Sequence, residues 1–144
     1  MKILLTLPYP PSLNSLYRTI IKGKGPMARA MPIKSKEYRD YEQIIEHWHL
    51  MNDRPRIEKP GVVSLTVHMY RPRRVGDLDN ALKALLDVLT GHIYEDDSQI
   101  AELHAFRHDD KDKPRVELVI DEIPFAEQQA QPPQGTMFDD GGVA

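Results

Sequence analysis

One pair of neighbouring segments limits the possible folds of this chain more than any other feature: a segment of alternating apolar and polar residues, followed by a segment with the pattern of an amphipathic helix. Residues 62–70, VVSLTVHMY, alternate apolar with polar side chains, which is the period of a strand with one buried face. Residues 79–90 place leucines at the three- and four-residue spacings of a helix, and Gly91 follows where such a helix would end. Because a helical crossover favours parallel neighbours, we expect a sheet with helices packed on it.

The remaining segments extend this pattern to the order β-α-β-α-β-β. Residues 2–8 read as a short strand stopped by prolines, and a helix is expected from about Ser35, a suitable N-cap, to about Met51. Two more strands are expected at roughly 98–107 and 115–122, joined by the turn-like HDDKDKP, which favours antiparallel neighbours. The predicted class is α/β (mixed α+β): a small single domain with a mixed four-stranded sheet and two main helices.

Residues 9–34 do not follow a regular period. They contain four prolines and two glycines, which predicts a long irregular segment, and such segments are usually functional or mobile. The first helix has a predicted buried face at Tyr38, Tyr41, Ile44, Ile45, Trp48 and Met51. The second has a predicted core stripe at Leu78, Leu82, Leu85, Leu86 and Leu89.

Size and composition narrow the class further. The 144 residues suit one domain with a modest core. The absence of cysteine excludes disulfides and thiolate metal sites and favours a reducing cytoplasm. No apolar run reaches the roughly 20 residues of a membrane helix, so no membrane partner is expected. Residues 124–144 are rich in Gln, Pro and Gly and predict a disordered acidic tail behind a domain at 1–123.

Charge is unevenly distributed along the chain. The formal net charge is -3, but residues 121–144 hold five acidic residues and no lysine or arginine. Residues 18–39, by contrast, carry seven basic residues against one glutamate. Such a stretch suits a phosphate backbone, although a solvated basic loop is an equal alternative from charge alone. The DNA-binding candidates within it are Arg18, Lys22, Lys24 and Arg29.

Carboxylates gather at the start of the second predicted helix, in RRVGDLDNALKALLD at residues 73–87. Asp77 lies just before the first turn, and Asp79, Lys83 and Asp87 share one helical face. A third acidic group, Glu95–Asp97, follows the helix where the chain re-enters the sheet. Clustered carboxylates raise each other's pKa unless a cation lies between them, and they are the ligands that Mg²⁺ and Mn²⁺ prefer.

An arginine loop precedes this group, with Arg71, Arg73 and Arg74 as further DNA-binding candidates. Basic side chains beside an acidic metal site suit a phosphodiester substrate, since the loops hold the backbone while the metal offsets carboxylate–phosphate repulsion. The structural alternative is that the helix dipole favours the aspartates, which then form ion pairs along the helix.

Other metal sites fit the sequence less well. An EF-hand interpretation of DLDNAL fails, because Ala81 stands at a ligand position and Leu82 where the turn needs glycine. His47 and His49 lie about 200° apart on a helix with no cysteine nearby, which indicates surface or core histidines rather than a zinc site.

Three motifs together resemble the RusA family of Holliday junction resolvases, found in bacteria and lambdoid prophages. The family's proline-rich opening is matched by LPYPPSLNSLYR at residues 7–18. Its central motif, basic residues followed by DLDN and a lysine, is matched by RRVGDLDNALKALLD at residues 73–87. Its acidic pair at the entry to a strand is matched by IYEDDSQI at residues 93–100. The likeness covers about residues 3–122, and the three motifs in this order and spacing are specific. It implies a Mg²⁺-dependent endodeoxyribonuclease, with Mn²⁺ as a substitute metal, that acts as a homodimer in recombination and repair.

The resemblance also implies residue roles. Asp77, Asp79 and Asp97 match the family's metal-binding aspartates, Lys83 its catalytic lysine and Asn80 a supporting residue. The implied reaction is hydrolysis of a phosphodiester by an activated water, leaving a 5′-phosphate and a 3′-hydroxyl in each of two opposed strands of a four-way junction. The chain would then act in the bacterial cytoplasm, encoded by the host or a prophage.

Two departures and two rival functions stay open. The segment between Lys83 and Asp97 is one residue shorter than the family pattern, which leaves Asp96 as an alternative third ligand. Residues 75–76 interrupt the basic run before Asp77. The rivals are a junction-binding factor without nuclease activity and a nuclease for forks or flaps. The sequence does not indicate the cleavage preference, the number of metal ions or the dimer face.

The tail holds one further candidate motif. QGTMF at 134–138 resembles short peptides that bind the bacterial sliding clamp, with Gln134, Met137 and Phe138 as the contact residues. Two apolar side chains at the end of a flexible tether suit a groove on a partner protein.

Overall fold

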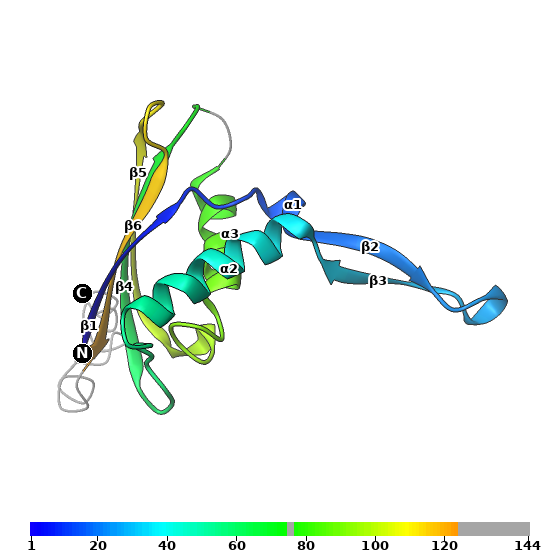
Figure 1. Cartoon of the computed structure of the whole chain (residues 1–144), viewed down its shortest axis with the longest axis horizontal. Helices are drawn as coiled ribbons and strands as arrows, with labels where there is room; N and C mark the ends of the chain where they lie inside the picture. The colour runs from blue at the N-terminus through cyan, green and yellow to red at the C-terminus, as the bar shows by residue number, and fades with distance from the viewer. Residues whose placement is uncertain (75–76, 124–144) are drawn as a thin grey trace, which may run out of the picture.

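Four strands form one mixed sheet in the order β1-β6-β4-β5 in the computed structural model, which describes residues 1–74 and 77–123. β6 pairs antiparallel with β1 and β4, whereas β4 runs parallel to β5 (Figure 1). The strands are β1 (Lys2–Pro8), β4 (Val62–Arg71), β5 (Ile100–Asp109) and β6 (Arg115–Ile123). The predicted α/β class and the mixed four-stranded sheet are confirmed.

The order of the strands corrects one expectation. The short turn after β5 was expected to join antiparallel neighbours, but β4 lies between β5 and β6. β4 has the longest alternating pattern, and its inward residues Val63, Leu65, Val67 and Met69 are fully buried. The strand with most apolar surface therefore takes a position where both of its edges are paired, and the chain after β5 crosses over it.

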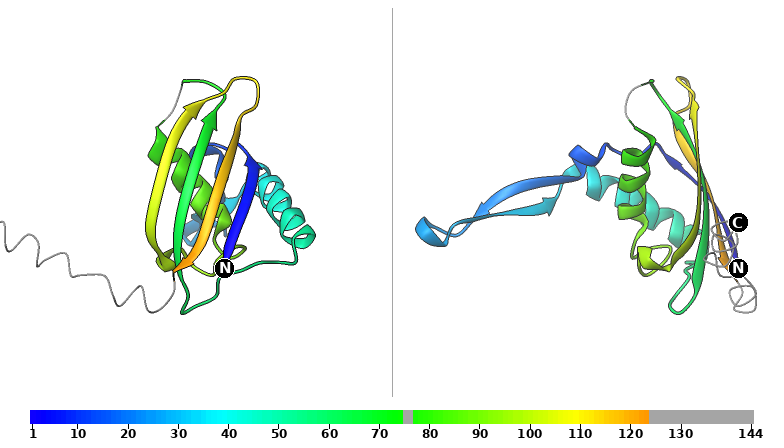
Figure 2. Two further views of the ribbon diagram at one scale, coloured as in Figure 1. Left: turned by 90° about the vertical axis from the view of Figure 1, so that its left-hand side faces the viewer. Right: turned by 180° about the vertical axis from the view of Figure 1, so that it is seen from behind.

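Two helices cover one face of this sheet (Figure 2). α2 (Lys36–Met51) begins at Ser35, whose hydroxyl accepts a hydrogen bond from the Tyr38 backbone N–H, as an N-cap should. α3 (Leu78–Leu89) ends as predicted before Gly91, which has φ 90°. The helices bury Tyr38, Tyr41, Ile45, Ala84, Leu85, Val88 and Leu89 against the inward residues of β1, β4 and β6.

The predicted apolar faces are only partly buried. On α2, Trp48 is partly buried, but Ile44 and Met51 are 41% and 70% exposed because the sheet underlies a narrower stripe than the sequence pattern predicts. On α3, Leu78, Leu82 and Leu86 pack at the margin of the core around the fully buried Leu85 and Leu89.

The segment expected to be irregular is ordered instead. It contains α1 (Leu13–Leu16) and a second sheet of β2 (Tyr17–Lys22) and β3 (Arg29–Lys34), with the short 3₁₀ helix η1 (Gly25–Met27) at its tip. These strands form an arm that extends away from the main sheet, here called the basic arm (Figure 1). The arm was not predicted because its segment contains prolines and shows little alternation of apolar and polar residues. A two-stranded ribbon has solvent on both edges and needs no apolar face, so such a pattern is not required.

The described helices include none that is both long and apolar enough to cross a bilayer. The proposed division into a domain at 1–123 and a tail at 124–144 stays a prediction, because the tail lies outside the described residues.

Candidate active site

The start of α3 presents two exposed aspartates to solvent. Asp77 is the N-cap residue, with an extended backbone (φ -90°, ψ 145°), but its side chain makes no capping hydrogen bond. Asp79 stands in the first turn, and its Oδ1 accepts a hydrogen bond from the Asn80 backbone N–H at 3.0 Å. The positive end of the helix dipole favours negative charge here, which lowers the cost of placing two carboxylates together.

Lys83 lies one turn further along the same face and is exposed. Among the described residues, no ion pair within 4.0 Å joins Lys83 to a carboxylate. The structural alternative, in which Asp79–Lys83 and Lys83–Asp87 ion pairs run along the helix face, is therefore absent at ion-pair distance, although the charge of Lys83 does lower the pKa of Asp87. The ammonium group is left available for an anion from outside the chain.

Asp87, which the sequence analysis did not count among its candidates, interacts electrostatically with two of them. Burial raises the pKa of Asp87, the charge of Lys83 lowers it, and the charge of Asp97 raises it again. The chain after α3 folds back along the helix, because the Tyr94 hydroxyl donates a hydrogen bond to the Leu86 carbonyl at 3.2 Å. The position of Asp87 on the Lys83 face was the available signal in the sequence.

The three acidic residues at 95–97 have different surroundings. Glu95 accepts a hydrogen bond from the Lys59 backbone N–H at 2.9 Å. Asp96 caps η2 (Asp97–Gln99) in a capping box with Gln99 and forms an ion pair with Lys59 at 3.6 Å. The Ser98 hydroxyl, as the largest cause, holds the pKa of Asp96 below its usual value.

Asp97 takes no part in that capping box, and its side chain is exposed. Its position is fixed from both sides. Buried Gln99 donates hydrogen bonds to the carbonyl oxygens of Ile57 and Gly61, at 3.1 and 2.9 Å. Fully buried Tyr94 donates from its hydroxyl to the Leu86 carbonyl at 3.2 Å, which attaches the chain before η2 to α3.

The predicted ligands do not form a closed cluster. In the described part of the chain, the set of three potential ligand side chains whose atoms lie within 4.8 Å of one another is Glu42, Glu46 and His92. Asp77, Asp79 and Asp97 do not form such a set. Exposed carboxylates repel one another without a cation between them and are free to rotate, so their role as a ligand set stays a prediction.

The cluster of Glu42, Glu46 and His92 has a structural explanation. Glu42 bonds His92 at 2.9 Å and Lys34 at 3.2 Å, which joins α2 to the turn after α3 and to the base of the basic arm. Burial alone would raise the pKa of Glu42, but the hydrogen bonds from His92 and Lys34 lower it. His49, one of the two histidines considered for zinc, hydrogen-bonds the Pro55 carbonyl at 2.8 Å instead.

The predicted DNA-contacting arginines fall into two groups. Arg71 is largely buried, and its Nε donates to Asp109 Oδ1 at 2.7 Å. Arg74 donates to the other oxygen of Asp109 at 3.2 Å but is exposed, as is Arg73. Arg71 is therefore fixed in place by the fold, while the other two point outward.

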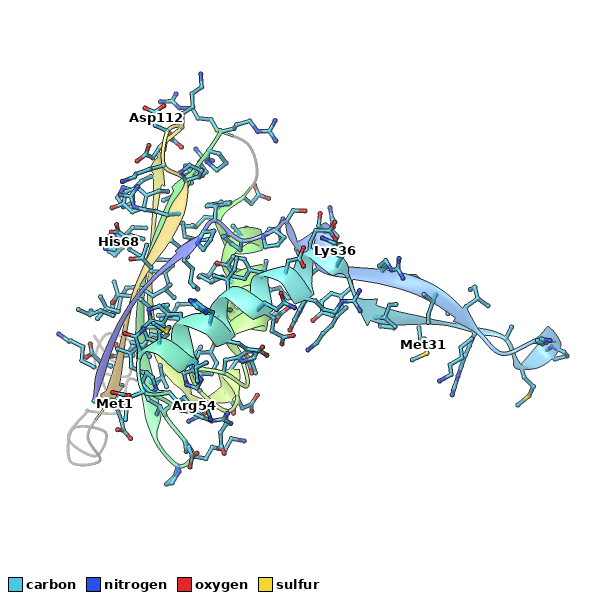
Figure 3. All side chains as sticks on the ribbon, viewed as in Figure 1. Met1, Met31, Lys36, Arg54, His68 and Asp112 are labelled. Carbon is cyan, nitrogen blue, oxygen red and sulfur yellow. The ribbon has the colours of Figure 1, made fainter. Side chains whose placement is uncertain are left out.

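The basic residues of the arm are all exposed. Arg18, Lys22, Lys24 and Arg29 lie on the basic arm, and Met31 in Figure 3 lies about midway along it. In the register of the arm, Lys22 stands directly across from Arg29. Like charges directly opposite each other destabilise a ribbon, so this pair indicates an anionic partner.

A pocket of about 450 Å³ adjoins Asp77 at the start of α3. Its walls are residues 9–14, residues 71–73 and the start of α3 at Asp77, Asn80 and Ala81. A larger hollow of about 720 Å³ lies over the ends of β1 and β6 and includes no residue of α3. Residues 75–76 and the tail motif of Gln134, Met137 and Phe138 lie outside the described residues.

The chain is similar in sequence to known proteins. A family model described as "Endodeoxyribonuclease RusA" matches residues 8–121. The chain is also similar to an uncharacterized protein, YqaN, of Bacillus subtilis (strain 168), with 30% identity over 114 residues, covering 64% of this chain and 77% of YqaN. The family match includes the arm, the start of α3 and η2.

Proposed function

The chain belongs to the RusA family of endodeoxyribonucleases, and on this premise we propose that it resolves four-way DNA junctions by metal-dependent nicks in two opposed strands. The observation that carries the proposal is the exposed acidic face of α3, with Asp77 and Asp79 at its start, Lys83 without an ion pair among the described residues, and Asp97 folded back toward Asp87. A face that only bound DNA would be better served by basic side chains in these positions.

The chemistry of the proposed donors, though not their spacing without a bound ion, suits a divalent cation. Asp77, Asp79 and Asp97 are exposed carboxylates, the oxygen ligands that Mg²⁺ and Mn²⁺ take. Asp97 is the better third candidate, because the oxygens of Asp96 are used by its capping box and by Lys59. A cation bound there supplies charge compensation for the phosphate and lowers the pKa of a water molecule.

The residues of the chain itself divide the remaining work. The basic arm and Arg73 hold the DNA backbone, and Lys83 stabilises negative charge that builds up on the scissile phosphate. As the bond from water oxygen to phosphorus forms, the bond to O3′ breaks, and O3′ takes a proton. The products are a 3′-hydroxyl and a 5′-phosphate.

Two further parts of the proposal concern assembly and location. A homodimer suits the substrate, since one site cuts one strand and a two-fold axis presents two sites to a two-fold junction. We place the reaction in the bacterial cytoplasm, where DNA is present and a cysteine-free chain needs no oxidising compartment. Clamp binding by Met137 and Phe138 stays a prediction that the comparisons do not support; a pull-down in which alanine at both positions changes nothing would exclude it.

The test uses labelled four-way junction, fork and linear duplex, each with Mg²⁺, with Mn²⁺ and with chelator. We expect metal-dependent cleavage of the junction, symmetric about its centre. Asp79→Asn and Asp97→Asn should each lower cleavage at least about 100-fold, the loss expected when a charge-stabilising group is removed from an active site, and both should still bind the junction. Asp96→Asn is the matched control, because asparagine also caps helices well.

The outcomes separate the candidates. Equal cleavage of forks and junctions would favour the fork nuclease, and binding without cleavage under any metal would favour the non-catalytic junction binder, which the basic arm also supports. Full activity of Asp79→Asn would reject the active-site assignment.

A further inference from the structure

We propose that the pocket beside Asp77 holds one unstacked nucleobase of the strand being cut, next to the scissile phosphate, and so sets the sequence preference of cleavage. The inference rests on the proposed function, because Asp77 and Asn80 belong both to the pocket and to the candidate active site. A nucleoside is covalently joined to its phosphate, so a phosphate held at Asp77 brings a base to the mouth of this pocket.

The size and enclosure of the pocket suit a base. Its volume of about 450 Å³ lies within the range of roughly 300–1,000 Å³ for sites that enclose small ligands. Enzymes that act on or read an unpaired base take it out of the stack into such a pocket, at least cost where pairing is already disturbed, as at the centre of a junction.

The walls favour a planar apolar ring over a phosphate group. Pro10, Pro11 and Pro72 supply flat apolar surface and have no backbone N–H with which to bind an anion. Tyr9 provides an aromatic ring at the pocket, and stacking on such a ring stabilises a bound base. Burial raises the pKa of Tyr9, although the charge of Arg71 opposes this, so the phenol stays neutral near neutral pH.

This wall is held rigidly. The hydroxyl of buried Tyr41 donates to the Pro8 carbonyl at 2.6 Å, directly before the pocket loop. Pro10 is buried, and Leu13 packs against the core. The Nε of Arg71 donates to Asp109 at 2.7 Å, which fixes the direction of its guanidinium group at the pocket wall.

The polar groups can read a base edge. Asn14 and Asn80 both line the pocket and are exposed, and their side-chain amides make no hydrogen bond within the described part of the chain. Each amide offers donors and an acceptor, the combination that pairs with the mixed edge of a nucleobase. A site for phosphate would instead gather donors only.

The experiment has a binding arm and a cleavage arm. In the binding arm, 2-aminopurine replaces single bases around the crossover, and fluorescence is read on saturation with protein in chelator, so that nothing is cut. We expect a rise at one position next to the cut site, lost in Tyr9→Ala and unchanged in Gln43→Ala, an exposed residue of α2. No rise at any position would overturn the inference.

In the cleavage arm, each of the four bases is placed at that position. We expect rates to differ by at least about tenfold, the discrimination of one paired amide, and Asn14→Ala to reduce the spread to about threefold. Junctions cut without base preference by the wild-type protein would reject the pocket and leave the nuclease assignment intact. If the fluorescence shows an unstacked base but the junction is not cut under any condition, the pocket assignment is supported and the nuclease assignment is rejected.

Discussion

Neighbouring residues of one chemical type take different roles here because their surroundings differ. The side chain of Asp96 caps η2, accepts a hydrogen bond from the Ser98 hydroxyl and forms an ion pair with Lys59. The neighbouring Asp97 takes no part in the capping box. Arg71 is buried against Asp109, whereas Arg73 is exposed. At this scale, the residues of the proposed site are the exposed members of each pair, which no ion pair within 4.0 Å among the described residues holds in place.

Asp87→Asn tests the electrostatics of the acidic face. Because burial and Asp97 raise the pKa of Asp87, the folded state favours its protonated form, and ionisation costs stability as pH rises past the ordinary value. We expect the substitution to increase the free energy of unfolding at pH 7 by about 0.5 kcal/mol or less, since solvent screens a partly exposed group, and to have no effect near pH 3. Urea denaturation at both pH values measures this.

A carboxylate on α2 provides the opposite control. Asp40 forms an ion pair with Lys36 at 2.8 Å and holds the pKa of that lysine above its ordinary value. Asp40→Asn should therefore lower stability at pH 7. If both substitutions lowered stability at pH 7, the ionised Asp87 carboxylate would be stabilising, and the unfavourable effect of burial and of Asp97 on its charge would be disproved.

At the scale of elements, the basic arm and its anchor are the parts least expected from the sequence. The two strands pair over their full length but contribute little to the core, since their side chains are mostly exposed. The arm joins the body through Ser35, whose backbone N–H donates to the Leu16 carbonyl at 2.9 Å and whose hydroxyl donates to the Ser15 carbonyl.

Lys22→Gln with Arg29→Gln should weaken junction binding through charge alone. Each phosphate contact contributes about 0.9 to the slope of log affinity against log salt, so removing both should reduce the slope by about 1.8 if both contact phosphates. The matched control is Lys2→Gln with Arg54→Gln: Figure 3 shows Arg54, and Met1 next to Lys2 in the chain, at the end of the body away from the arm. Equal slopes for the two double variants, measured by fluorescence anisotropy from 50 to 200 mM salt, would exclude the arm from the DNA interface.

Ser35→Ala should destabilise the protein through its helix. Loss of the N-cap bond to Tyr38 costs about 1 kcal/mol in typical helices, and burial of Ser35 adds to this. Ser12→Ala removes an exposed hydroxyl bonded to Ser15 and should cost clearly less. Urea midpoints compare the two, and an equal loss would mean that the cap does not hold α2.

At the scale of the whole molecule, helices and arm lie on the same side of the sheet (Figure 2). The opposite face carries stacked rings, in which His68 lies 4.8 Å from Phe106 and 5.2 Å from His108, measured between ring centroids (Figure 3). Phe106 is 47% exposed on it. The acidic face, the pocket and the basic arm are thus gathered on the side where α3 packs, and one molecule presents one candidate site.

Mixed dimers test whether two sites are needed. Equal amounts of wild-type protein and Asp79→Asn, after exchange of subunits, give about half heterodimers if they assort at random in a two-fold dimer. On a supercoiled cruciform plasmid these should nick one strand, so nicked circles accumulate where wild-type protein gives linear product. Unchanged yields of linear product would indicate that each molecule cuts independently.

The sequence by itself determined the four strands of the main sheet, the two main helices and the acidic motif, because periodicity, caps and the spacing of DLDN and Lys83 are local properties of the chain. Only the tertiary structure decided that β6 lies between β1 and β4, that residues 17–34 form an arm, and that the charge of Asp97 acts on Asp87. The tertiary structure also gave Asp96 and Asp97 different surroundings and formed the pocket beside Asp77. These features depend on contacts between segments far apart in the chain, where packing and hydrogen bonding, not local pattern, select among similar residues.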